Sequence, residues 1–146
     1  MRLVRVGAVG SEIPGALLDD DTFVDLSDVV DDFNEAFFAS CHRALKDDGI
    51  LVQQSESPLV LLDLIKEMRA EMGKAGFASF QTLPFPQPCY PTGYWSCTIA
   101  SKTARDLSAF REGDASSKPF ATQYYNVGIH SGALMQPEFM REALGD

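Results

Sequence analysis

The sequence has few cysteines, no long hydrophobic run and no leader-like start, and each absence excludes a class of protein. No stretch approaches the roughly 18 consecutive apolar residues that a membrane-spanning helix needs. The start, MRLVRVGAVG, lacks the apolar core of a signal peptide. The three cysteines, Cys41, Cys89 and Cys97, are widely spaced and form no metal-binding pattern. We therefore expect a cytoplasmic protein with reduced thiols and no membrane partner.

Positive charge is also scarce in this chain. Lysine and arginine together number 12 against 21 aspartates and glutamates, which gives a formal net charge of −9. Binding of phosphate backbones needs a basic surface, so nucleic acid is not an expected partner. A negative field attracts cationic ligands, although an acidic surface also serves solubility alone.

Familiar catalytic motifs are missing as well. The sequence contains no G-x-S-x-G, Walker loop, H-E-x-x-H or paired C-x-x-C. His42 follows Cys41 within a predicted helix, but adjacent helical residues point about 100° apart, so we expect no Cys-His nucleophilic pair and an exposed His42. His130 lies in a predicted loop, where a hydrogen-bonded structural role is favoured over that of a base.

The 146 residues that are present suit one domain with a single core. Residues 1–32 predict a strand followed by a hairpin that turns at Asp19-Asp20-Asp21. This aspartate-rich stretch lacks the central glycine and terminal glutamate of a calcium-binding EF-hand loop, so we interpret it as a solvated turn.

From Asn34 the pattern changes to alternating helices and strands. Asn34 is a predicted N-cap, and Ser57-Pro58 predicts the start of a second helix whose core face holds four apolar positions. These positions are Leu61, Leu64/Ile65, Met68 and Met72. The predicted strands span 50–54, covered on both faces, 77–83 and 94–100, with an irregular proline-rich loop 84–93 and a loop before a short helix from Pro137.

Polar residues follow the apolar strand 50–54 and are the best candidates for a site. The amide of Gln54 and the carboxylate of Glu56 can both accept hydrogen bonds from an ammonium group at the end of a strand. Tyr90 lies in a rigid loop between two prolines and, with Tyr94 and Trp95, could wall a slot for an aliphatic cation. The alternative is that Tyr90 and Trp95 simply cover one end of the core.

Three segments together resemble the C-terminal part of spermidine synthase, a polyamine aminopropyltransferase. They are GILVQQSESPLVLLDLIKEMRAEM, FPQPCYPTGYWSCTIASK and QYYNVGIHSGALMQPEFMREAL, and the likeness runs from about residue 33 to residue 143. The resemblance implies an α/β fold, namely the C-terminal half of a Rossmann-like, methyltransferase-type sheet with flanking helices, preceded by a short β-hairpin segment. It also implies transfer of an aminopropyl group from decarboxylated S-adenosylmethionine to putrescine, with Gln54 and Tyr90 at the polyamine end of the groove and Glu56 close by.

Other parts of that family's pattern are absent from this sequence. The Gly-rich adenosine-binding loop GGGDG, the acidic ribose-binding residue and the catalytic D-[ST]-x-D-P segment should precede Phe33, and none is found. Residues 1–32 instead resemble the leading β-segment of fumarylacetoacetate hydrolase-type proteins. We therefore interpret the chain as a chimera of segments 1–32 and 33–146, joined near Asp32-Phe33, and assign no catalytic residue, cofactor or metal ligand.

These observations lead to one functional hypothesis and two alternatives. The first is a spermidine synthase-like protein that is catalytically incomplete by itself and binds putrescine or another diamine weakly, in the millimolar range. The second is a non-enzymatic assembly module whose open sheet edge pairs with a copy of itself or with a complementing chain. The third, a fumarylacetoacetate-type hydrolase, ranks last because the matching segment ends before any metal ligand.

Overall fold

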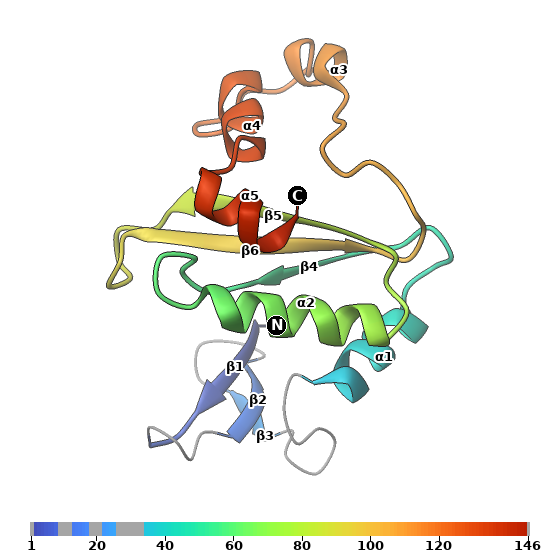
Figure 1. Ribbon diagram of the computed structural model, residues 1–146. Coiled ribbons are helices and arrows are strands. Elements are labelled where there is room, and N and C mark those ends of the chain that lie inside the picture. Colours follow the sequence, from blue (N-terminus) through green and yellow to red (C-terminus); the bar gives the residue numbers. More distant parts are fainter. Residues whose placement is uncertain (1, 9–12, 18–21, 26–33, 146) are drawn as a thin grey trace.

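The computed structural model describes residues 2–8, 13–17, 22–25 and 34–145, and Figure 1 shows their arrangement. The strands are β1 (Arg2–Val6), β2 (Ile13–Leu17), β3 (Phe23–Asp25), β4 (Ile50–Gln54), β5 (Ser79–Pro86) and β6 (Tyr94–Ser101). The helices are α1 (Glu35–Ala44), α2 (Leu62–Lys74), α3 (Glu112–Ser116), α4 (Val127–Leu134) and α5 (Glu138–Leu144). The mixture of helices and strands confirms the predicted α/β class.

The first sheet is small and antiparallel, in the order β1-β2-β3. Strands β2 and β3 pair from Gly15↔Asp25 to Leu17↔Phe23, which confirms the predicted hairpin. Its expected turn, Asp19–Asp21, and the expected junction at Asp32-Phe33 lie outside the described residues.

The second sheet has the order β4-β6-β5, with β6 antiparallel to both neighbours. Strands β4 and β5 are therefore parallel to each other, and α2 connects them as a crossover helix (Figure 1). Strand β4 has the predicted bounds, but the expectation that both of its faces are covered was wrong. Ile50 and Val52 are 44% and 59% exposed, because β4 is an edge strand of the described sheet.

Strand β5 is longer than predicted, because Pro84 and Pro86 lie within it instead of in a loop. Gln87 donates its backbone N–H to Gly93, which fixes the hydrogen-bonded positions at odd-numbered residues of β5. The two prolines occupy the even-numbered positions, where a strand residue would direct its N–H away from β6. Since β5 is an edge strand, the missing donors cost no hydrogen bond within the described sheet.

Helix α1 begins where the sequence predicts. The Asn34 side chain accepts hydrogen bonds from the backbone N–H groups of Ala36 and Phe37, at 3.0 and 3.4 Å. The predicted start of the next helix at Ser57-Pro58 was wrong. The Ser57 carbonyl instead accepts from the backbone of Val60 and Leu61, which closes a turn before the helix.

The core lies between α1, α2 and one face of the β4-β6-β5 sheet. Its buried residues form a cluster of Phe37, Phe38, Met72, Phe77 and Ala100. Half-buried side chains surround this cluster, Leu51 of β4 and Met68 of α2 among them. Helix α2 also buries Ile65 but leaves Leu61 and Leu64 exposed, so part of its predicted core face was wrong.

The C-terminal region is more helical than predicted. Helix α4 occupies part of the expected loop, with the Asn126 side chain accepting from the backbone of Ile129 at 2.9 Å. Helix α5 follows Pro137 as predicted and buries Met140. His42 is half-buried against Phe77, with ring centroids 5.2 Å apart, so its predicted exposure was wrong. None of the helices in the described ranges is long and apolar enough to cross a membrane.

Candidate functional site

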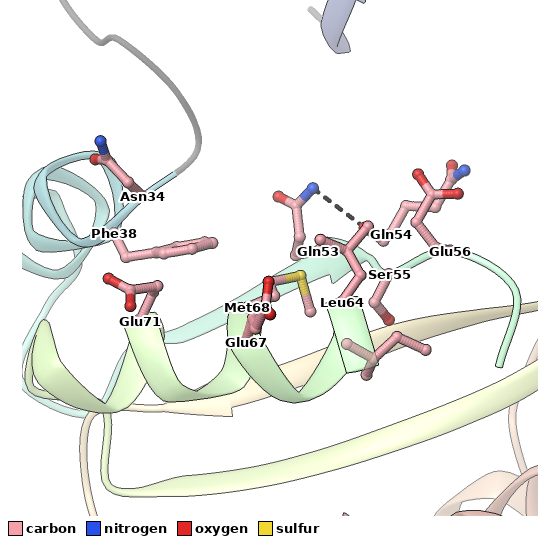
Figure 2. Close-up of a pocket in the computed structure, with 11 residues that line it drawn as sticks. Asn34, Phe38, Gln53, Gln54, Ser55, Glu56, Leu64, Glu67, Met68 and Glu71 are labelled. Atoms are coloured by element: carbon pink, nitrogen blue, oxygen red, sulfur yellow. Dashed lines mark hydrogen bonds between the residues drawn. The ribbon is translucent and has the colours of Figure 1, made fainter. Parts of the chain in front are cut away.

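A cavity of about 300 Å³ opens where the carboxyl end of β4 meets α1 and α2 (Figure 2). Its walls come from the start of α1, from the β4 end and the loop that follows it, and from one side of α2. The lining residues are Asn34, Phe38, Gln53, Gln54, Ser55, Glu56, Leu64, Ile65, Glu67, Met68 and Glu71.

The structure brings two of the three predicted site residues together at this cavity. Gln54 ends β4, Glu56 follows two residues later, and Figure 2 shows their side chains next to each other. The Gln53 amide donates to the Gln54 carbonyl at 3.2 Å. Amide and carboxylate oxygens of this kind accept hydrogen bonds from cations.

Glu56 has an unusual backbone and a perturbed side chain. Its φ is +65°, and it is the single non-glycine residue with positive φ in the part of the chain that the structure describes. Non-glycine residues pay a steric cost in this region and commonly occur there at functional sites. Burial raises the pKa of the Glu56 carboxyl above its ordinary value, because a low-dielectric surrounding disfavours the charged form.

A buried network of hydroxyl groups holds the backbone around Glu56. The Ser96 hydroxyl lies within hydrogen-bond distance of the Ser55 carbonyl, 3.1 Å, and the Glu56 carbonyl, 2.9 Å. Ser55 is also hydrogen-bonded to Ser96 and Thr98, and Thr98 to Thr82, at 3.0–3.1 Å. The two carbonyls around the strained residue are therefore held from the central strand β6.

Two further carboxylates, Glu67 and Glu71, line the cavity from α2. They are four residues apart and so project from the same side of the helix. Glu71 pairs with Lys74 at 2.6 Å, whereas Glu67 is exposed to solvent. Sequence reasoning missed both residues, although the four-residue spacing on an amphipathic helix was a usable signal.

Tyr90, the third predicted site residue, lies in the tight β5–β6 connection but does not line the cavity. Hydrogen bonds Tyr90 N to Gln87 O, 3.0 Å, and Gly93 N to Tyr90 O, 2.9 Å, fix this turn, and Gly93 supplies a φ of +64°. The Tyr90 ring packs against Trp95 with centroids 4.6 Å apart. By strand register Tyr90 lies at the same end of the sheet as Gln54, since Gln54 pairs with Cys97 near the start of β6.

The cysteines and histidines of the described residues lie outside the cavity. No group of three or more side chains that could hold a metal ion occurs among the residues that the structure describes. Burial raises the pKa of the Cys41 and Cys97 thiols, which keeps both in the less reactive protonated form. His130 is stacked on Phe110 at 4.0 Å and is hydrogen-bonded through Nδ1 to the Tyr125 hydroxyl at 2.9 Å, so it has a packed, hydrogen-bonded position as expected.

Comparison with known proteins places this arrangement in a family. The spermine/spermidine synthase domain matches residues 18–109, more than half of the chain. The chain belongs to this family. The match begins before the expected boundary at 32–33, and the chimera itself stays a prediction.

Individual relatives agree with the family assignment. Polyamine aminopropyltransferases of Xanthomonas oryzae pv. oryzae and Xanthomonas campestris pv. campestris are each 67% identical over 114 residues. This alignment covers 78% of the chain but only 40% of either relative.

Solved structures give the same picture. Spermidine synthase from Thermotoga maritima has a TM-score of 0.67 at 29% identity, covering 79% of this chain and 40% of that one. A spermidine synthase in complex with the transition state analogue AdoDATO has a TM-score of 0.67 at 28% identity, with coverages of 77% and 38%. The chain thus spans about two fifths of the proteins that it resembles, and it has the fold of the corresponding part of a spermidine synthase.

Proposed function

We propose that this chain forms the diamine-binding part of a polyamine aminopropyltransferase, that it binds putrescine or a similar diamine at the β4 cavity, and that it is catalytically incomplete alone. The observation that carries this proposal is the pairing of Gln54 and Glu56 at the cavity, within a chain that is 67% identical to polyamine aminopropyltransferases over 114 residues.

The distribution of polar groups around the cavity suits a ligand with a cation at each end. Gln54 and Glu56 lie at the β4 end, and Glu67 and Glu71 lie along α2 (Figure 2). Between them the wall is apolar, with Phe38, Leu64 and Met68 available to contact a methylene chain. A volume of about 300 Å³ is at the lower end of the range for small-molecule sites.

The chemistry of aminopropyl transfer explains why the chain should be inactive by itself. An amine nitrogen of putrescine attacks the aminopropyl carbon that is bonded to the sulfur of decarboxylated S-adenosylmethionine. The C–S bond breaks, methylthioadenosine leaves, and the attacking nitrogen loses a proton. The resemblance assigns adenosine binding to the GGGDG loop and deprotonation of the amine to the D-[ST]-x-D-P segment, and this sequence has neither. We expect no resident cofactor, and we expect the chain to act in the cytoplasm.

Binding is tested by titrating the isotope-labelled chain with putrescine and, separately, with methylthioadenosine while recording amide resonances. Putrescine should shift the resonances of residues 53–56 with a dissociation constant of about a millimolar or weaker, since an open site lacks charged hydrogen bonds worth about 1.5–3 kcal/mol each. Gln54→Ala and Glu56→Gln should reduce these shifts, and the exposed Gln123→Ala serves as the control. Shifts near Gln54 with methylthioadenosine but none with putrescine would overturn the proposal.

Activity is tested with decarboxylated S-adenosylmethionine and putrescine as substrates. The chain alone should release no methylthioadenosine, whereas the Xanthomonas oryzae relative serves as the positive control. Turnover by the 146-residue chain at a rate comparable to that relative would contradict catalytic incompleteness.

A further inference from the structure

A second cavity, of about 340 Å³, lies between β5, the segment that precedes α3, and the junction of α4 with α5. Its lining residues are Gln81, Ser108, Leu134, Met135, Gln136 and Arg141. None of them lines the β4 cavity, and all of them lie within residues 81–141. A ligand of this second cavity is therefore separate from the diamine proposed above.

The cavity forms where α4 meets the edge of the β4-β6-β5 sheet. Helix α4 packs against β5 and ends at Leu134, where the Met135 backbone N–H donates to the Gly132 carbonyl at 3.2 Å. The Gln136 amide donates to the Thr82 carbonyl of β5, which ties the α4–α5 junction to the sheet (Figure 1). The walls from β5 and from the helices are therefore fixed relative to each other.

Gln81 is the buried polar group of this cavity. It lies opposite Ile99 in the β5–β6 ladder and is only 8% exposed. Its side-chain amide makes no hydrogen bond to any residue that the structure describes. A buried amide without a partner costs free energy, so nearly all such groups in proteins are hydrogen-bonded. Because Gln81 lines the cavity, a molecule bound there can supply the missing partner.

Arg141 supplies the positive charge of the cavity. Its Nη1 donates to Glu138 at 2.9 Å, and its Nε and Nη2 groups donate to no residue in the described part of the chain. These two nitrogens share one edge of the planar guanidinium, with a spacing that matches the two oxygens of a carboxylate. The side chain is 58% exposed, so this edge is accessible to a ligand.

The other lining residues favour a singly charged ligand with an alkyl chain. Ser108 donates its hydroxyl to Asp106 at 2.6 Å, so it has no proton left for an anion. With a formal chain charge of −9, a phosphate dianion meets more repulsion here than a carboxylate does. Leu134 and Met135, the latter 75% exposed, add apolar surface that an alkyl chain can cover.

We propose that this second cavity binds a small alkyl carboxylate, whose oxygens accept hydrogen bonds from Arg141 and from the Gln81 amide and whose alkyl chain packs on Leu134 and Met135. This inference is independent of the proposed function, because the two cavities share no lining residue.

The test is a titration of the isotope-labelled chain with isovalerate, recorded on the side-chain resonances of Gln81 and Arg141. Isovaleramide has the same shape without the charge and serves as the control ligand. We expect isovalerate to shift both resonances and isovaleramide to bind at least about tenfold more weakly, because it cannot form charged hydrogen bonds. Inorganic phosphate should also bind more weakly than isovalerate.

Two arginine variants test the charged end of the site. Arg141→Gln should weaken isovalerate binding by about tenfold or more, because it removes the charge and the paired donors. Arg111 is a matched control, since it also pairs with an acidic residue three positions along, Asp114 at 3.1 Å, but lies outside this cavity. Arg111→Gln should leave the affinity for isovalerate unchanged.

Gln81→Met tests the amide, because methionine has a similar length and no hydrogen-bonding amide. It should weaken isovalerate binding by about tenfold without lowering the midpoint of urea unfolding, since the free chain loses no hydrogen bond. A lowered midpoint would mean that the amide has a structural role instead.

Several outcomes would overturn the inference. They are equal binding of isovalerate and isovaleramide, tighter binding of inorganic phosphate, no shift at Gln81, and equal losses in Arg141→Gln and Arg111→Gln. Putrescine titration at residues 53–56 tests the proposed function separately, so the failure of either proposal can be recognised.

Discussion

At the scale of single residues, the backbone of Glu56 is held by a hydroxyl group that does not line the cavity. A φ of +65° is costly for a glutamate, and the Ser96 hydroxyl lies within hydrogen-bond distance of the carbonyls of Ser55 and Glu56. Ser96 is fully buried in β6, so its position is set by the central strand. We interpret Ser96 as a positioning residue for the carboxylate at the cavity.

Replacing Ser96 with alanine should therefore affect stability and the site together. The Ser96→Ala variant removes a donor to the carbonyls of Ser55 and Glu56, and we expect it to lower the free energy of unfolding by about 1–3 kcal/mol, measured by urea denaturation. The exposed Ser117, whose hydroxyl donates to the Gly113 carbonyl at 2.7 Å, provides the control Ser117→Ala. Equal effects of the two substitutions would contradict a special role for Ser96.

The raised pKa of Glu56 predicts a pH dependence of diamine binding. Burial favours the neutral carboxyl, so Glu56 contributes stability at acid pH that is lost as the pH rises through its raised pKa. A diamine needs the charged carboxylate, so its affinity should increase over that same pH interval. Putrescine titrations at a series of pH values should show this increase in the native chain and a smaller one in Glu56→Gln, where Glu67 and Glu71 remain, whereas identical profiles would argue against Glu56 as a ligand-binding group.

The sequence indicated where two cavity-lining residues lie, whereas their role in binding a ligand stays a prediction. Gln54 and Glu56 were found because they follow an apolar strand, and the cavity contains both. Ser96 could not be found, because its partners are some 40 positions away and meet it only through the pairing of β4 with β6. Glu67 was hidden among other charges on an exposed helical surface.

At the scale of elements, α2 has a narrower buried face than its apolar residues suggested. Ile65 is 1% exposed and its neighbour Leu64 is 47% exposed, so the two side chains point in different directions. Ile65→Ala should lower the free energy of unfolding by about 2–5 kcal/mol. Leu64→Ala should change it by less than about 1 kcal/mol. Thermal or urea unfolding of both variants measures these changes. Similar losses of stability would contradict the observed difference in burial between Ile65 and Leu64.

The errors at this scale have physical causes that the local sequence does not reveal. Ser57-Pro58 fits a helix start and also fits a turn, and the turn forms because the Ser57 carbonyl accepts two backbone bonds. Pro84 and Pro86 were expected to end a strand, but they occur where the lost N–H would face outward. Both outcomes depend on register and edge position, which are properties of the assembled sheet.

At the scale of the whole molecule, the resemblance carried more information than any pattern of hydrophobicity. It implied part of a Rossmann-like domain. Two findings confirm this: the chain aligns with only 40% of its relatives' length, and its TM-score to a spermidine synthase is 0.67. The antiparallel central strand was not predicted, since strand order depends on contacts between distant segments. Nor did composition alone indicate that β4 has an open side.

The central place of β6 also has a consequence for how the chain folds. Its bond to β5 at Thr82···Thr98 joins residues 16 apart, whereas its bond to the β4 end at Ser55···Ser96 joins residues 41 apart. Closing the longer loop costs more chain entropy, so the β5–β6 hairpin should form early and β4 should dock late.

Kinetic measurements on two substitutions can test this order. Thr82→Ala in the hairpin should mainly slow folding, and Leu51→Ala in β4 should mainly speed unfolding, as stopped-flow chevron plots would show. The reverse assignment would mean that the β4 contacts form first. In the predicted order, a nascent chain has its β5–β6 hairpin in place while the edge of β6 that receives β4 is still unpaired, so another strand can compete with β4 for that edge before the native sheet is complete.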